Sequence, residues 1–258
     1  MSDAMSDSTP PYQAYILCTA PRSGSTLLCS LLRASGVAGN PASYFHEASL
    51  AEWLDDLGIA VSPSTPERTR IALAFAAAQS QGKAGGDLFG LRLQAHSLPF
   101  FLRQLACLHP QQATDTARLT RAFGRIRFLY LHRADKLDQA VSFLKARQSG
   151  LWHRAADGSE LERLAPHQDP HYDRAAIDAT IATLQGYDRT WEDWFTAQGI
   201  TPLRLSYDRL SADPRTTLRA ILAELGRDPA AADRATPGVR KLADATSRDW
   251  VARYRAGD

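Results

Sequence analysis

The stretch ILCTAPRSGSTLLCSLL, residues 16–32, decides the fold because it joins an apolar segment to a helical pattern through a short basic loop. Residues 15–20 read YILCTA, typical of a buried strand, and leucines then recur at helical spacing until Gly36. The first turn of a helix leaves several backbone N–H groups unpaired, and together with the helix dipole they favour an anion. The loop over residues 22–26 therefore predicts a cradle for a tetrahedral anion.

The side chains of this loop suit a phosphate or a sulfate. Gly24 lets the backbone come close to an anion, and the hydroxyl groups of Ser23, Ser25 and Thr26 add donors. Arg22 adds a planar, permanently charged fork that can hold two oxygens. An ordinary strand-to-helix turn remains open for this loop taken alone. The loop lacks the GxxxxGKS/T spacing of a nucleoside triphosphate site and the GxGxxG pattern of a dinucleotide site, which disfavours both.

Outward from this loop, apolar segments alternate with helical patterns. Further strands are predicted at 87–93, 125–133 and 201–207, and helices at 67–81, 98–107, 172–198 and 213–226. Residues 149–171 are rich in histidine, glycine, proline and charge, and they predict a long loop. The alternation predicts an α/β fold, a P-loop-like parallel β-sheet flanked by helices, with ligands at the carboxyl ends of the strands.

A second basic element follows one of these strands. In LYLHRADKLDQAVSFLKARQ, residues 129–148, Arg133 ends the strand and Ser142 lies nine residues later in the next helix. The two side chains together can grip a second phosphate at the neighbouring strand end. Two plainer interpretations stay open: Arg133 as a surface ion-pair partner, and Ser142 as a helix residue that bonds its own backbone.

Composition limits the class of protein. The chain has 258 residues, 44% of them apolar, which suits one core; we expect a disordered tail over residues 1–12 and a single domain over residues 13–258. A net charge of +2 argues against nucleic-acid binding through bulk charge. The three cysteines form no CxxC pair, which favours reduced, buried thiols. No apolar run is long enough for a transmembrane segment, and we expect a cytoplasmic protein.

Two segments carry a resemblance to a known family. APRSGSTLLCSLLRASGVAGNP, residues 20–41, and LHRADKLDQAVSFLKARQSGLW, residues 131–152, resemble the sulfotransferases that use 3′-phosphoadenosine 5′-phosphosulfate (PAPS), with the nearest likeness to the bacterial trehalose 2-sulfotransferase family. The resemblance implies the sulfotransferase fold and transfer of a sulfuryl group to a hydroxyl of a carbohydrate or glycolipid, with no metal. It implies that residues 22–26 bind the 5′-phosphosulfate and that Arg133 and Ser142 bind the 3′-phosphate. It also implies a homodimer, with an interface expected near Trp191.

The acceptor side departs from the family pattern. The position that holds the general base, a glutamate, in the trehalose enzymes is Ser43 here, and Tyr44 and Arg92 are expected beside it at the acceptor. The nearest substitutes for the base are His46, whose ordinary pKa suits proton transfer, and Glu47, one helical turn from Ser43. A solvated surface role for His46 and Glu47, and a structural ion pair for Arg92, stay open.

Two other functions remain open beside the sulfotransferase. A homologue that binds the nucleotide but has lost transfer activity fits the missing glutamate, and a small-molecule kinase fits the first loop alone. Titration with adenosine 3′,5′-bisphosphate against ATP separates the kinase from the other two, because Arg133 and Ser142 should prefer a 3′-phosphate.

Overall fold

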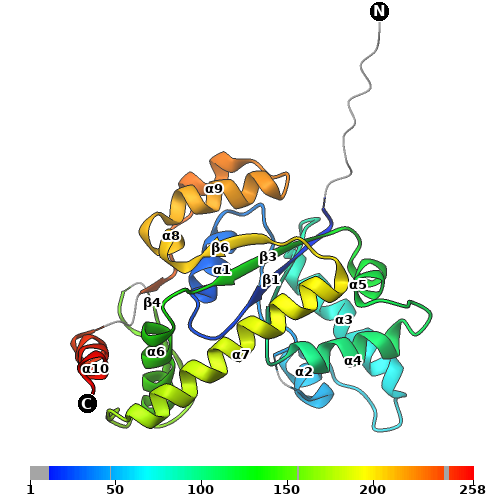
Figure 1. Cartoon of the computed structure of the whole chain (residues 1–258). Helices are drawn as coiled ribbons and strands as arrows, with labels where there is room; N and C mark the ends of the chain where they lie inside the picture. The colour runs from blue at the N-terminus through cyan, green and yellow to red at the C-terminus, as the bar shows by residue number, and fades with distance from the viewer. Residues whose placement is uncertain (1–11, 47, 156, 241–243) are drawn as a thin grey trace, which may run out of the picture.

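A parallel four-stranded sheet forms the centre of the molecule (Figure 1). The computed structural model describes residues 12–46, 48–155, 157–240 and 244–258. The strand order is β2-β1-β3-β6, and every neighbouring pair runs parallel. The strands are β1 (Ala14–Thr19), β2 (Phe89–Gln94), β3 (Ile126–His132) and β6 (Leu203–Ser206). The predicted α/β class with a parallel sheet is confirmed.

Strand β1 is fully buried because it lies between β2 and β3 and is covered on both faces. Successive side chains of a strand point to opposite faces. Accordingly Ile16 and Cys18 join one apolar cluster while Tyr15 and Leu17 join the other. The near-continuous apolar sequence of this strand thus reflects its central place in the sheet.

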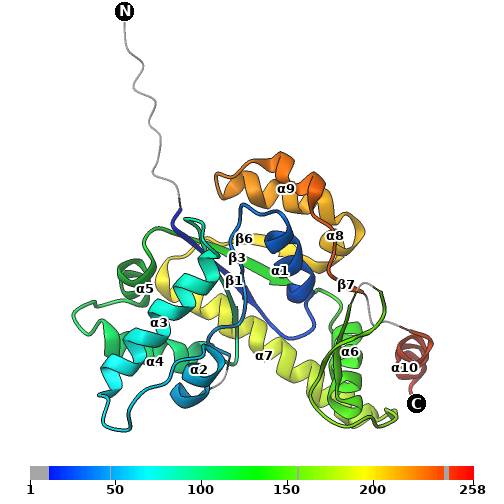
Figure 2. The same cartoon turned by 180° about the vertical axis from the view of Figure 1, so that it is seen from behind.

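Helices cover both faces. The helices are α1 (Ser25–Ala34), α2 (Leu50–Asp56), α3 (Glu67–Lys83), α4 (Leu98–Leu108), α5 (Asp115–Phe123), α6 (Lys136–Ser149), α7 (Arg174–Gln198), α8 (Tyr207–Ala212), α9 (Pro214–Glu224), the 3-10 helix η1 (Pro229–Arg234) and α10 (Ala245–Ala256). The first cluster packs one face of the sheet against α2 to α5 and α7, and the second packs the other face against α1 and the helices that follow β6 (Figures 1 and 2).

The prediction of a long loop over residues 149–171 is wrong. Strands β4 (Leu151–Ala155) and β5 (Glu160–Arg163) form an antiparallel hairpin here, and β7 (Val239–Arg240) pairs with β4. The pairing of β4 with β5 is irregular and β5 is mostly exposed, so the segment carries no clean alternation of apolar and polar residues. The hairpin lies beside α6, at the end of the molecule that also holds α10 (Figures 1 and 2).

Several smaller expectations concern the cysteines, an interface, the chain ends and membrane segments. Cys107 is exposed, whereas Cys18 and Cys29 are buried as expected. Trp191 is fully buried in the core, so an interface cannot use it. The expected tail lies, apart from Tyr12, outside the described residues, and the single domain over residues 13–258 stays a prediction. Among the helices of the described ranges, none is long and apolar enough to span a bilayer.

Candidate functional site

The loop between β1 and α1 is held from two sides. At its start, the Trp191 indole N–H donates to the Thr19 carbonyl at 2.9 Å, and the Gln139 side chain donates to the Pro21 carbonyl at 2.7 Å. The Thr19 and Ser23 hydroxyls share a hydrogen bond of 2.5 Å. These bonds come from α7, α6 and the strand end, so three elements fix the path of the loop before α1 begins.

Gly24 is required by the shape of this loop. Its φ is +89°, in the left-handed region, and it occupies the N-cap position of α1. A Cβ placed there would lie 2.6 Å from Cδ2 of Tyr207, the first residue of α8. The guanidinium of Arg133 lies 4.5 Å from the centre of the same ring. Tyr207 therefore packs between the first loop and the second basic element.

Arg22 joins the two predicted elements directly. Its Nε donates to Ser142 Oγ at 3.0 Å, and another guanidinium nitrogen donates to the Trp152 carbonyl of β4 at 2.6 Å. Burial, and then the charge of Arg133, lower the pKa of Arg22 to about 10, so its charge persists at neutral pH. The structure thus brings Arg22, Ser142 and Arg133 to one place, at the carboxyl ends of adjacent strands.

Arg133 is buried and only partly paired. Its side chain is 9% exposed, and one terminal nitrogen lies 2.9 Å from Asp138 Oδ2. Its Nε is buried and has no hydrogen-bond partner within the described part of the chain. A buried N–H without an acceptor is costly and rare in folded proteins. The ion pair that the sequence analysis kept as an alternative is therefore present, between Arg133 and Asp138. The Nε–H of Arg133 takes no part in it.

Arg92 links the first loop to the expected acceptor side. It lies in β2, the strand next to β1, and its Nε donates to Ser43 Oγ at 2.7 Å. Another of its nitrogens donates to Thr26 Oγ1 at 3.0 Å. Ser43, Arg92 and Thr26 therefore form one connected group at the mouth of the loop.

Tyr44 and His46, two other predicted site residues, make contacts outside this group. Tyr44 is buried in the core, where its hydroxyl donates to the Asn40 carbonyl at 2.6 Å and burial raises its pKa to about 12. His46 is exposed, and its ring lies 4.9 Å from that of His96. Burial, and then the charge of His46, lower the pKa of His96 to about 4. Glu47 lies outside the described residues.

Two contributors to the site were missed. Tyr207 directly follows β6, so the rule that ligands gather at carboxyl ends of strands could have found it. His153 lies on β4, with Nε2 at 3.1 Å from Thr26 Oγ1. No local signal points to it, because the segment was predicted to be a loop.

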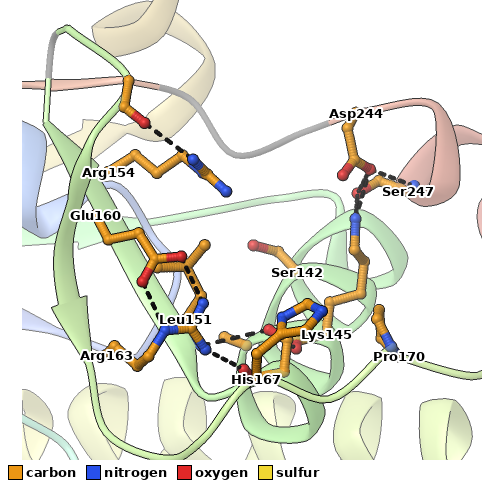
Figure 3. Close-up of a pocket in the computed structure, with 13 residues that line it drawn as sticks. Ser142, Lys145, Leu151, Arg154, Glu160, Arg163, His167, Pro170, Asp244 and Ser247 are labelled. Atoms are coloured by element: carbon orange, nitrogen blue, oxygen red, sulfur yellow. Dashed lines mark hydrogen bonds and ion pairs between the residues drawn. The ribbon is translucent and has the colours of Figure 1, made fainter.

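A cavity of about 540 Å³ opens beside Ser142 (Figure 3). It lies between α6, the β4–β5 hairpin and the start of α10. Lys145 of α6 contacts Asp244 Oδ1 at 2.5 Å and Ser247 Oγ at 2.9 Å, which fixes the start of α10 against α6. Ser142 therefore borders a space large enough for part of a small ligand, whereas neither Arg22 nor Arg133 lines it.

The chain is similar to one protein family, to two named relatives and, at low similarity, to a solved structure. The sequence profile of the family described as Stf0 sulphotransferase matches residues 14–257. A trehalose 2-sulfotransferase of Mycobacterium tuberculosis is 29% identical over 262 residues, with 94% of each chain covered. One of Mycolicibacterium smegmatis is 28% identical over 259 residues, again with 94% of each covered. A solved sulfotransferase domain from the Synechococcus PCC 7002 olefin synthase covers 98% of this chain and 90% of its own, with a TM-score of 0.42 and 15% identity.

Proposed function

The chain belongs to the Stf0 sulfotransferase family, and from this premise we propose that it moves the sulfuryl group of PAPS to a hydroxyl of a carbohydrate or glycolipid. One observation carries the proposal: Arg22 and Arg133 follow the adjacent strands β1 and β3 and meet around Ser142 and Tyr207. Two such elements suit the two ends of one doubly phosphorylated nucleotide. Both relatives are named for trehalose, which supports a carbohydrate acceptor.

The residues present fit the proposed donor. The unused Nε of Arg133 is a buried N–H that an oxygen of a 3′-phosphate would satisfy, and Ser142 is held next to Arg22 by a hydrogen bond of 3.0 Å. Residues 22–26 offer an arginine fork, three hydroxyls and the N-terminus of α1 to a phosphosulfate. The described residues contain no group of three or more His, Cys, Asp or Glu side chains suited to a metal.

The chemistry is an in-line displacement at sulfur. When bound, the donor supplies an activated sulfonate whose bond to the phosphate oxygen breaks as the acceptor oxygen bonds to sulfur. In this proposal Arg22 stabilises the charge that gathers on the sulfonate and the leaving phosphate. The helix N-terminus and the hydroxyls of Ser23, Ser25 and Thr26 hold the group in line. The acceptor hydroxyl loses its proton to a general base.

We propose that the acceptor binds on the side of Arg92 and Ser43. Both lie at the mouth of the loop through Thr26, and their polar groups match the hydroxyls of a sugar. Tyr44 is left out of this proposal because its hydroxyl already donates inside the core. The homodimer and the cytoplasmic location stay predictions.

Arg133→Ala tests the donor assignment. We expect the donor KM to rise about 10- to 100-fold, because a charge-assisted hydrogen bond to the 3′-phosphate is lost. The acceptor KM should stay within about threefold. Steady-state assays of both substrates, with trehalose as the first acceptor tried, measure this. Arg204→Ala is the matched control, since Arg204 is an exposed arginine on β6, the strand next to β3, and pairs with Glu192 of α7. An unchanged donor KM in Arg133→Ala would refute the assignment.

Two variants test whether His46 or Glu47 is the general base that accepts the proton of the acceptor hydroxyl. If His46 or Glu47 accepts the proton, His46→Ala or Glu47→Gln should lower kcat about 100-fold or more, and the other variant should have little effect. Comparison of kcat over a range of pH measures this. Normal turnover in both variants excludes both residues. Binding of adenosine 3′,5′-bisphosphate without turnover on any sugar supports the inactive homologue instead.

A further inference from the structure

His153 lies against the loop that binds the anion in the proposed function. It projects from β4, and its Nε2 is 3.1 Å from Thr26 Oγ1 and 3.4 Å from Glu162 Oε2 of β5. Its neighbour Trp152 supplies the carbonyl that accepts from Arg22 at 2.6 Å. The hairpin is therefore attached to the loop at two points, one of them a titratable ring.

The hydrogen bonds around Thr26 are compatible with a neutral His153. Arg92 donates to Thr26 Oγ1 at 3.0 Å, and the hydroxyl of Thr26 can in turn donate its proton to His153 Nε2. Accepting it requires a lone pair on Nε2, which a neutral imidazole can present there and an imidazolium cannot. Burial, then the charges of Arg22 and Arg92, lower the pKa of His153 to about 4. His153 is therefore neutral near pH 7 before the donor binds.

We propose that His153 is a further residue of the donor site, a group that takes up a proton when a phosphosulfate or phosphate fills the loop and then donates its Nε2–H to that anion. This rests on the proposed function. The charged groups that act on His153 include Arg22 of the loop, Arg92 of β2 and Glu162 of β5. A bound anion offsets the positive charge of the two arginines, while Glu162 continues to stabilise an imidazolium. Binding of the anion therefore raises the pKa of His153. The proton comes from solvent and returns when the product leaves.

The sign of the pH effect follows from this coupling. Because the bound state holds the proton more tightly than the free state, binding takes up protons and strengthens as pH falls through the bound-state pKa. The limit is about tenfold in affinity per pH unit. The phosphates of the ligand protonate near pH about 6, which weakens binding as pH falls. That opposing effect is common to the wild type and every variant. The ratio of the wild-type affinity to the affinity of His153→Gln therefore isolates the effect of His153.

Calorimetric titration with adenosine 3′,5′-bisphosphate tests the proposal without turnover. We compare the wild type, His153→Gln, which keeps a hydrogen-bonding group but cannot titrate, and His171→Gln, an exposed histidine outside the site. Buffers of different ionisation enthalpy give the protons taken up, from about pH 8 to about pH 5. We expect less uptake in His153→Gln than in the wild type, and a ratio of affinities that grows as pH falls. His171→Gln should match the wild type.

The outcomes separate the two proposals. Equal proton uptake and a constant affinity ratio in the wild type and His153→Gln overturn the role of His153 and leave the donor assignment standing. Failure of the wild type to bind the bisphosphate at any pH overturns the proposed function, and this role with it. Glu162→Gln gives a second test that keeps the imidazole: the uptake should persist but shift to lower pH, and an unshifted uptake contradicts the part given to Glu162.

Discussion

Arg22→Ala should lower kcat for sulfuryl transfer about 100- to 1,000-fold, the loss typical of removing one preorganised donor from a developing negative charge. Two observations make this the largest expected catalytic effect. Arg22 is the charged side chain of the loop itself, and its pKa of about 10 keeps it a cation under assay conditions. Its guanidinium also links Ser142 of α6 to Trp152 of β4, so its removal loosens both neighbours of the loop.

A matched variant separates the side chain from the backbone. Arg22 has a φ of +62°, a conformation that costs a residue with a Cβ about 1–2 kcal/mol and costs glycine little. Arg22→Gly should therefore be more stable than Arg22→Ala but equally slow. Single-turnover rates at saturating donor measure the chemical step. Turnover near the wild-type rate in either variant would rule out a catalytic part for this arginine.

Gly24→Ala should both destabilise the protein and weaken binding of the nucleotide. The positive φ and the 2.6 Å approach to Tyr207 together should cost about 2–4 kcal/mol of unfolding free energy. The displaced ring lies under Arg133, so the affinity for adenosine 3′,5′-bisphosphate should fall about tenfold or more. Urea denaturation and calorimetry measure the two effects.

Gly36→Ala is the control for this variant. Gly36 has a φ of +73°, and a Cβ there meets no atom within 4 Å. It should cost about 1–2 kcal/mol from its backbone conformation and leave nucleotide affinity unchanged. Equal losses of affinity in both variants would show that general destabilisation, and not the contact with Tyr207, is responsible.

The sheet was predictable because its signals are local. Strands β1 and β3 are mostly apolar runs of strand length, each followed by a residue pattern typical of a helix, and such runs are typical of strands inside a parallel sheet. The edge strand β6 instead alternates apolar and polar residues, which is the pattern of a half-buried strand. The loop after β1 was predictable for the same reason: Gly24 and the hydroxyl residues mark a strand-to-helix turn. Arg133 was found because it directly ends a strand.

What was missed depends on contacts between distant segments. The hairpin β4–β5 has an irregular register and an exposed second strand, so its sequence shows no strand periodicity. Without the hairpin, nothing in the sequence indicates that His153 lies beside the loop after β1. Tyr44 was placed beside the acceptor from its neighbour in sequence, yet adjacent residues can point in different directions, and its ring lies in the core. Helical spacing alone does not say which face of α7 is buried. The sequence therefore could not show that Trp191 lies in the core and not at an interface.

The most direct measurement compares three ligands by calorimetry: adenosine 3′,5′-bisphosphate and its 5′- and 3′-monophosphates. If Arg22 and Arg133 hold opposite ends of one nucleotide, the wild type binds the bisphosphate most tightly. Arg133→Ala should then lose the preference over the 5′-monophosphate, and Arg22→Ala should lose the preference over the 3′-monophosphate. Equal loss of both preferences in both variants, or a wild type that binds the bisphosphate no better than either monophosphate, would contradict it.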